Sequence, residues 1–245
     1  MSRSIADLAS EELMALVRQG ELDDLQVLEV LRSPFCTPQI AEMVASDRRY
    51  LAAQSVRELL AGFPGFSFAR AMDLISSLPW TSLLALAQTP RTPPVVRRQA
   101  ERKLIFQIAS MTLGERIAMA RRAHRALFSA LMGGWDDKIL SALLDNPRMV
   151  ENDVVVLINT GEPPLDFYGV VARHRKWGGY YGVRRALVEC PRTPLPLALS
   201  IMVQLPRSDH KRIAKRETLS EPIREAAAGL FARATSGANL GGARD

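Results

Sequence analysis

The chain has 245 residues, of which 47% are hydrophobic and 24% are charged, and its formal net charge is +6. This composition excludes a disordered or fibrous chain and allows a substantial core, in one elongated unit or in two compact domains. We expect a cytoplasmic protein, because there is no run of about 18 apolar residues to span a membrane and the first residues lack the apolar core of a signal peptide.

Helix signals run through the whole chain, whereas strand signals and hairpin turns are almost absent. The predicted helices cover residues 10–20, 23–32, 51–61, 69–78, 80–87, 92–108, 115–123, 139–144, 153–158, 165–173, 177–188, 195–205, 209–215 and 222–233, and a further helix begins at Thr37-Pro38 and contains Ile40, Met43 and Val44. The glycines of residues 133–134 are expected to break a further helix. We expect residues 234–245 to be a disordered tail, because they have little apolar surface to bury.

The dipeptide Thr-Pro occurs at three predicted helix starts, Thr37-Pro38, Thr92-Pro93 and Thr193-Pro194. Each threonine is expected to be the N-cap and each following proline the first helical residue. An upstream proline ends the preceding helix. Intervals of 56, 57 and 44 residues separate these upstream prolines, at positions 34, 90, 147 and 191, with Met149-Val150 in place of Thr-Pro in the third copy. Such irregular spacing predicts a stack of unequal helix pairs.

Two further helix starts are indicated by their capping residues. Thr112 and Glu115 have the spacing of a capping box, in which each side chain accepts a hydrogen bond from the other's backbone. Asp137 is predicted to be the N-cap of the helix that contains Ile139. The alternative is that Asp136 and Asp137 form a pair of catalytic acids.

Three segments, Asn146-Pro147-Arg148, residues 190–199 and residues 219–227, resemble bacterial leucine-rich repeat variant and HEAT-like α-solenoid proteins. The resemblance implies an all-α fold, an irregular α-solenoid whose short helical pairs form a right-handed superhelix, and a binding scaffold whose ligands differ widely. We expect this solenoid to cover residues 1–233, with a sub-boundary near residues 133–137. A known variant-repeat protein carries a cysteine cluster for iron and sulfur, which two isolated cysteines cannot supply. No cofactor is therefore predicted.

Catalytic and metal-binding patterns are lacking in the sequence. His124, His174 and His210 lie among basic residues, and no carboxylate stands three or four positions from His124 or His174 to orient a catalytic ring. Cys36 and Cys190 are far apart in sequence and are expected to be packing residues that precede helices. The prediction is a protein without catalytic residues or a metal site.

The positive charge is concentrated in two regions. Residues 1–60 hold 6 Arg and 10 Asp or Glu, whereas residues 91–125 hold 9 Lys or Arg and 2 Glu, and residues 170–216 hold 11 Lys or Arg and 2 acids. Nucleic acid, an acidic protein or anionic lipid would fit such regions. The alternative is that these residues only solvate the outer faces of helices.

Basic and aromatic residues alternate over residues 173–185. A helix beginning at Trp177 would place Trp177, Tyr181, Arg184 and Arg185 on one face, where arginines hold phosphates and an aromatic ring stacks on a base. The alternative is that Trp177 and Tyr181 anchor the helix in the core. The candidate ligand-binding residues are Arg97, Arg98, Arg121, Arg122, Arg173, Arg175, Lys176, Trp177, Tyr180, Arg184 and Arg185.

Three functional hypotheses follow. The first is a non-enzymatic scaffold that binds a protein or peptide in a groove, and the second is a nucleic-acid-binding protein that uses the basic helices. The third is a HEAT-like DNA-repair glycosylase, which would need an aromatic cradle from Trp80, Trp135 and Trp177 together with a catalytic acid in one cleft. The oligomeric state is not predicted.

Overall fold

The computed structural model describes residues 5–160 and 163–240, apart from the side chains of residue 6 and of residues 234–240. Every element in these residues is helical, with 16 α-helices, five short 3-10 helices (η1–η5) and no strand. The all-α prediction is confirmed. The chain divides into two compact units, residues 1–111 and 112–245, so the boundary expected near residues 133–137 lies inside the second unit.

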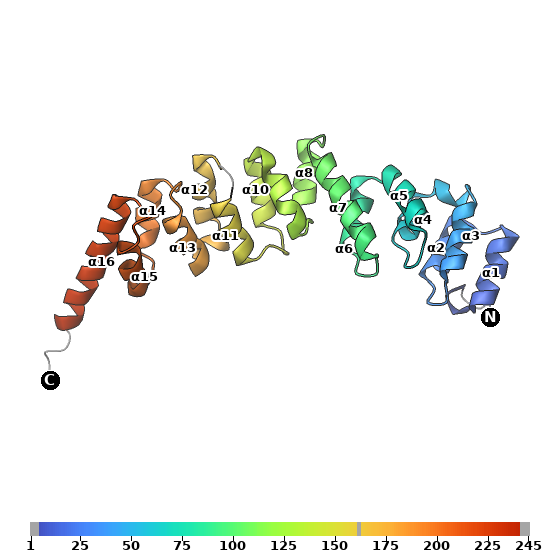
Figure 1. Ribbon diagram of the computed structural model, residues 1–245, viewed down its shortest axis with the longest axis horizontal. Helices are drawn as coiled ribbons and strands as arrows, with labels where there is room; N and C mark the ends of the chain where they lie inside the picture. The colour runs from blue at the N-terminus through green and yellow to red at the C-terminus, as the bar shows by residue number, and fades with distance from the viewer. Residues whose placement is uncertain (1–4, 161–162, 241–245) are drawn as a thin grey trace. The chain divides into compact units, whose positions relative to one another are not determined.

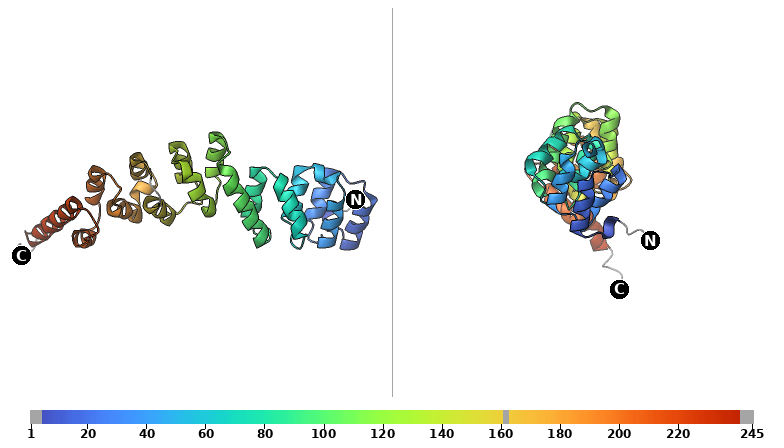
Figure 2. Two further views of the ribbon diagram at one scale, coloured as in Figure 1. Left: turned by 45° about the horizontal axis from the view of Figure 1, so that its top comes forward. Right: turned by 90° about the vertical axis from the view of Figure 1, so that its right-hand side faces the viewer.

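The first unit, residues 1–111, places its helices in two rows (Figures 1 and 2). One row holds α1 with α3 and α5 with α7, and the other holds α2, α4 and α6 in succession. Within the first row, Glu42 of α3 accepts a hydrogen bond from Arg70 of α5 at 2.6 Å and so joins the two pairs. In the second row, Gln54 of α4 donates to Ser82 of α6 at 3.0 Å. The helices are α1 (Ser10–Gln19), α2 (Asp24–Arg32), α3 (Pro38–Ser46), α4 (Gln54–Ala61), α5 (Phe68–Ser77), α6 (Trp80–Gln88) and α7 (Pro94–Ile108), with η1 (Ile5–Asp7) and η2 (Tyr50–Ala52).

The connectors α2–α3, α4–α5 and α6–α7 of this unit each contain a four-residue turn with proline at the second position. Residues 33–36, 63–66 and 89–92 each have proline in second place, and the fourth N–H donates to the first carbonyl at 3.1, 3.2 and 3.1 Å. The copy at residues 63–66 was missed by the Thr-Pro pattern. It divides the interval of 56 residues into 30 and 26, so one helix pair separates successive turns. Gly65 is left-handed at φ +81°, as a type II turn requires after Pro64.

The expected threonine N-caps are correct at one of the three Thr-Pro sites. Thr37 accepts from the Ile40 N–H and caps α3, which begins at Pro38. Thr92 and Thr193 instead end the preceding proline turns and are buried, so α7 begins at Pro94 and α14 at Leu195. The prediction was wrong there because the turn fixes these threonines one residue before the cap. The capping box of Thr112 and Glu115 is confirmed.

The second unit, residues 112–245, also arranges alternate helices in contact. In one row α8 contacts α10, α10 contacts α12 and α14 contacts α16, while α11 contacts α13 in the other. Fully buried side chains such as Leu127, Ile139 and Phe167 form its core. The α-helices are α8 (Leu113–Ala120), α9 (Phe128–Leu131), α10 (Asp137–Leu144), α11 (Glu151–Asn159), α12 (Leu165–Arg173), α13 (Tyr181–Glu189), α14 (Leu195–Met202), α15 (Arg207–Ala214) and α16 (Glu221–Leu240), with η3 (Arg125–Leu127), η4 (Met132–Gly134) and η5 (Trp177–Gly179).

Several helix boundaries in the second unit differ from the prediction. Residues 177–188 are not one helix, because η5 ends at Gly179 and α13 begins at Tyr181. The N-cap of α10 is Asp136, not Asp137, since Asp136 accepts from the N–H groups of Lys138 and Ile139. Helix α16 continues to Leu240 through part of the expected disordered tail, and residues 241–245 lie outside the described residues. In the described part of the chain, no helix is both long and apolar enough to cross a membrane.

Candidate functional site

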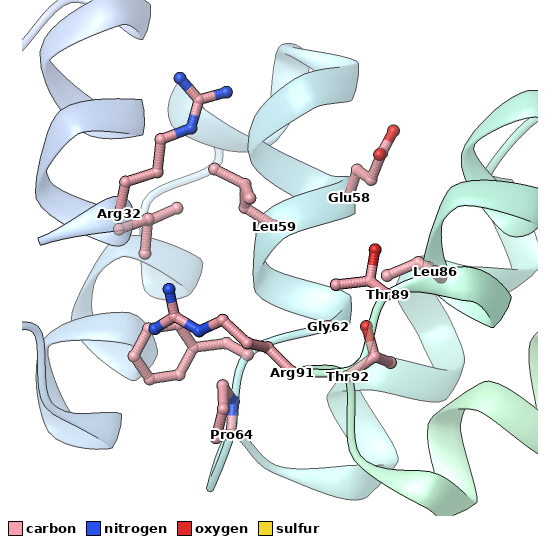
Figure 3. Close-up of a pocket in the computed structure, with 11 residues that line it drawn as sticks. Arg32, Glu58, Leu59, Gly62, Pro64, Leu86, Thr89, Arg91 and Thr92 are labelled. Carbon is pink, nitrogen blue, oxygen red and sulfur yellow. The ribbon is translucent and has the colours of Figure 1, made fainter. Parts of the chain in front are cut away.

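A pocket in the first unit lies at the C-terminal ends of α2, α4 and α6 (Figure 3). Its volume is about 120 Å³. Apolar groups form much of its wall, and its polar side chains come from three different elements. The lining residues are Leu31, Arg32, Glu58, Leu59, Gly62, Phe63, Pro64, Leu86, Thr89, Arg91 and Thr92.

Two proline turns and a close glycine contact shape this pocket. The turns of residues 63–66 and 89–92 bring Phe63 and Arg91 to it. Gly62 lies where a Cβ would stand 2.8 Å from Leu86 Cδ2 and 3.1 Å from Thr92 Oγ1. A side chain at position 62 would therefore force the Leu86 and Thr92 side chains to shift, whereas glycine lets the end of α4 approach them closely at the pocket wall.

The charged groups of the pocket are two arginines and one carboxylate. Arg32 comes from the end of α2, Arg91 from the α6–α7 connector and Glu58 from α4, with Glu58 drawn on the other side from both arginines (Figure 3). Arg32 and Arg91 are exposed, and neither makes an ion pair within the described residues. The pocket thus combines an apolar wall with two available guanidinium groups.

A second candidate surface in the second unit is formed by the connectors that follow α8, α10 and α12. Arg148 donates to the Arg122 carbonyl at 2.9 Å, and Asn146 donates to the carbonyls of Ala120 and Ala123 at 2.7 and 2.9 Å. Trp177 donates to the Leu144 carbonyl at 2.7 Å. These bonds place the three connectors beside one another.

This surface, which we call the basic edge, consists of the cationic residues on these connectors, all of them exposed. Residues 120–125, 144–149 and 173–180 contain seven Lys or Arg and a single carboxylate, Asp145. Asp145 faces His174 at 3.4 Å, and Arg125 pairs with Asp153 at 2.5 Å. The residues of the basic edge are Arg121, Arg122, Arg125, Arg148, Arg173, Arg175 and Lys176.

The predicted ligand-binding residues are brought together only in part. Arg121, Arg122, Arg173, Arg175 and Lys176 belong to the basic edge. Arg148, which also belongs to the basic edge, was not among the predicted binding residues. The sequence held a signal for it, because Arg148 occupies the third position of a proline turn, as Arg91 and Arg192 do. The pocket of the first unit was not predicted from the sequence.

The remaining predicted site residues have other surroundings. Trp177 is buried with 1% of its surface exposed, as its alternative interpretation as a core residue requires. Arg184 donates to the Gly178 carbonyl at 2.8 Å and Arg185 pairs with Glu189 at 3.2 Å, so both hold local structure. Arg97 and Arg98 lie on α7 of the first unit, in which Arg98 is exposed and Arg97 is half-buried.

Tyr180 and Tyr181 are exposed, in contrast to Trp177. Tyr180 is 41% exposed, and the centre of its ring lies 5.2 Å from that of the Trp177 ring, while the Lys176 ammonium stands 3.9 Å from the centre of the same indole. Tyr181 is held by a hydrogen bond that it donates to Asp209 at 2.8 Å. Tyr180 is thus an aromatic platform next to the basic edge.

The cysteines and histidines have structural partners. Burial raises the pKa of the Cys36 thiol to about 11, and Cys190 is buried with its Sγ 3.5 Å from the Ile158 carbonyl. His210 is buried and its Nε2 lies 2.9 Å from the Met202 carbonyl. In the described ranges, no three His, Cys, Asp or Glu side chains gather in a way that could hold a metal ion.

The comparisons with known proteins add no relative. The chain matches no family model, no curated protein and no solved structure.

Proposed function

We propose that the protein is a non-enzymatic helical-repeat scaffold of the α-solenoid kind, and that the pocket of its first unit binds a peptide segment of a partner protein. The segment that fits the pocket carries an apolar side chain next to a carboxylate. The observation that carries this proposal is the apolar pocket at the ends of α2, α4 and α6, with the available guanidinium groups of Arg32 and Arg91 at its rim.

The size of the pocket favours one side chain as the occupant. Sites for whole small-molecule ligands usually measure about 300–1,000 Å³, whereas this pocket measures about 120 Å³. An apolar cavity of about 150 Å³ holds benzene. One leucine-sized or aromatic side chain of a peptide therefore suits the space better than a substrate or cofactor would.

The two arginines favour a carboxylate beside that apolar side chain. Guanidinium groups bind carboxylates in a bidentate geometry. Glu58, the carboxylate of the pocket itself, lies across the pocket from both arginines (Figure 3), so it does not occupy their guanidinium groups. The competing explanation is that Arg32 and Arg91 only offset the negative C-terminal ends of nearby helices, a stabilisation of about 0.3–1 kcal/mol each. If the arginines bind the peptide, removal of both charges weakens peptide binding. If they only offset the helix ends, peptide affinity stays unchanged.

The test is a selection of random 12-residue peptides on the full-length chain, followed by binding measurements with the selected peptides. We expect an apolar residue next to Asp or Glu to be enriched. The double variant Arg32→Gln/Arg91→Gln should weaken binding about tenfold or more, because charge-assisted hydrogen bonds contribute about 1.5–3 kcal/mol each. Enrichment without an acidic residue, or unchanged affinity of the variant, would contradict the proposal.

A matched control is provided by the same unit. Arg48 and Arg102 are exposed, lie outside the pocket and make no ion pair within the described residues. The variant Arg48→Gln/Arg102→Gln removes the same charge and should leave peptide affinity unchanged. If both double variants weaken binding equally, the effect is one of net charge and not of the pocket.

A further inference from the structure

We propose that the basic edge of the second unit binds the sugar-phosphate backbone of single-stranded nucleic acid, with one base stacked on Tyr180. This site is separate from the peptide pocket, which lies in the first unit, and it does not depend on that pocket. The inference rests on the positive charge of this unit, on the cations of the edge that make no ion pair in the described residues, and on the exposed ring of Tyr180 beside them.

The net charge of the protein lies entirely in the unit that holds the basic edge. Residues 1–111 contain 12 Lys or Arg and 12 Asp or Glu, whereas residues 112–245 contain 20 and 14. The first unit is therefore neutral, and the second unit carries the whole +6. A positive unit attracts polyanions over distances comparable to the Debye length.

Four cations of the basic edge, on two of its connectors, are available for a ligand. Arg121, Arg173, Arg175 and Lys176 make no ion pair within the described residues, and Arg148 uses its guanidinium on a backbone carbonyl. Asp145 is the one carboxylate on these connectors, and it faces His174. A purely solvated face would usually mix both signs of charge, whereas this edge presents almost one sign.

The geometry of the edge suits an extended polyanion. The three connectors follow helices of one row, in which α8 contacts α10 and α10 contacts α12. Packed helices lie about 8–10 Å apart, so the cations are distributed over about 20 Å. A single bound phosphate would need only one connector, and a chain of phosphates can use all three.

Tyr180 makes a single strand fit better than a duplex. Its exposed ring borders an open concavity that is lined by Glu151, Lys176, Gly179, Tyr180 and Tyr181. The Glu151 carboxylate accepts from the Gly182 N–H at 2.6 Å, and its negative charge makes this concavity a place for a base and not for a phosphate. Unpaired bases can stack on such a ring, whereas the bases of a duplex are stacked on one another.

The test is fluorescence anisotropy of the full-length chain with labelled 20-nucleotide dT and U strands and with a 20-base-pair duplex, between 50 and 300 mM KCl. We expect both single strands to bind more tightly than the duplex. The logarithm of the single-strand binding constant should fall linearly with the logarithm of the KCl concentration, with a slope of about −0.7 for each phosphate contacted. Absence of binding at 50 mM KCl would overturn the proposal, as would binding of phosphatidylserine vesicles without binding of either strand.

The variant Arg121→Gln/Arg173→Gln/Arg175→Gln tests the cations. Because three phosphate-binding charges are removed, the salt slope should become about 2 units shallower and affinity at 50 mM KCl should fall on the order of 100-fold or more. The matched control is Lys138→Gln/Lys211→Gln/Lys215→Gln, which removes three exposed cations of the same unit outside the edge. An equal fall in affinity for the two triple variants would overturn the proposal.

The variant Tyr180→Leu tests the aromatic platform while it keeps an apolar side chain against Trp177. We expect single-strand affinity to fall about fivefold or more, because stacking on an aromatic side chain contributes at least that much per base. The salt slope should stay unchanged, since every cation that binds a phosphate remains in place. An unchanged affinity, or an equal fall for duplex and single strand, would contradict the stacking of a base on Tyr180.

Discussion

Asn146 joins two connectors of the second unit through a single buried side chain. Its amide donates to the carbonyls of Ala120 and Ala123, and its Oδ1 accepts from the Arg148 N–H at 2.8 Å. Only 1% of the residue is exposed. The carbonyls at the end of α8 are thus satisfied by a residue 23–26 positions later in the chain, and the same residue orients the turn that carries Arg148.

The substitution Asn146→Ala should destabilise the protein by about 2–4 kcal/mol, because it leaves two buried carbonyls and one N–H without their partner. Urea denaturation followed by circular dichroism would show a lower midpoint. The control is Asn152→Ala, at an exposed position of α11, where a change within about 0.5 kcal/mol is expected. Equal midpoints for the two variants would contradict the role of Asn146.

Cys36 gives a pH-dependent prediction. Because burial raises the pKa of its thiol from 9.0 to about 11, the folded state holds the proton more tightly than the unfolded state. The stability that this contributes is present below pH 9 and is lost as the pH rises from 9 to 11. Alkylation by iodoacetamide needs the thiolate, so its rate at Cys36 in the folded protein should keep rising up to about pH 11.

Peptide mapping by mass spectrometry distinguishes Cys36 from Cys190 in this experiment. In urea the alkylation rate of Cys36 should instead level off near pH 9, the ordinary pKa of the thiol. If the alkylation rate levels off near pH 9 in the folded protein as well, burial does not raise the pKa of the Cys36 thiol.

At the scale of the helices, two neighbouring carboxylates have different roles at the start of α10. Asp136 accepts from Lys138 and Ile139 at 2.9 and 3.2 Å, whereas Asp137 is the first helical residue. Asp136→Ala should lower the free energy of unfolding by about 1 kcal/mol. Asp137→Ala should lower it by less, because it loses only a favourable charge near the helix N-terminus. The prediction fails if Asp137→Ala proves the more costly of the two in urea titrations.

Most helices could be predicted from the sequence because their signals are local. Capping residues, apolar spacing and prolines lie within a few positions of each helix start. Thr92 and Thr193 show the limit of such signals, since a proline turn and an N-cap prefer the same residues and the turn prevails here. Residues 177–180 show another limit, because a glycine pair and the burial of Trp177 interrupt a helix that the spacing favours.

The candidate sites were less predictable than the helices because they depend on packing between distant segments. The Arg32 and Arg91 of the pocket are 59 residues apart and meet only through α2, α4 and α6. The cations of the basic edge were visible as charge-rich regions, but the hydrogen bonds of Asn146 and Trp177 that align the connectors were not. Tyr180 was selected from the sequence, although the helix that was expected to begin at Trp177 does not form.

At the scale of the whole molecule, we propose that the two units bind different ligands: a peptide in the pocket of the neutral unit and single-stranded nucleic acid on the edge of the positive unit. The most direct test is amide hydrogen exchange of the full-length chain, followed by mass spectrometry, with a selected peptide or with dT20. The peptide should slow exchange in residues 55–66 and 86–93, and dT20 in residues 120–125, 144–149 and 173–180. Protection of the same segments by both ligands, or of none of these segments by either, would contradict the assignment of one ligand to each unit.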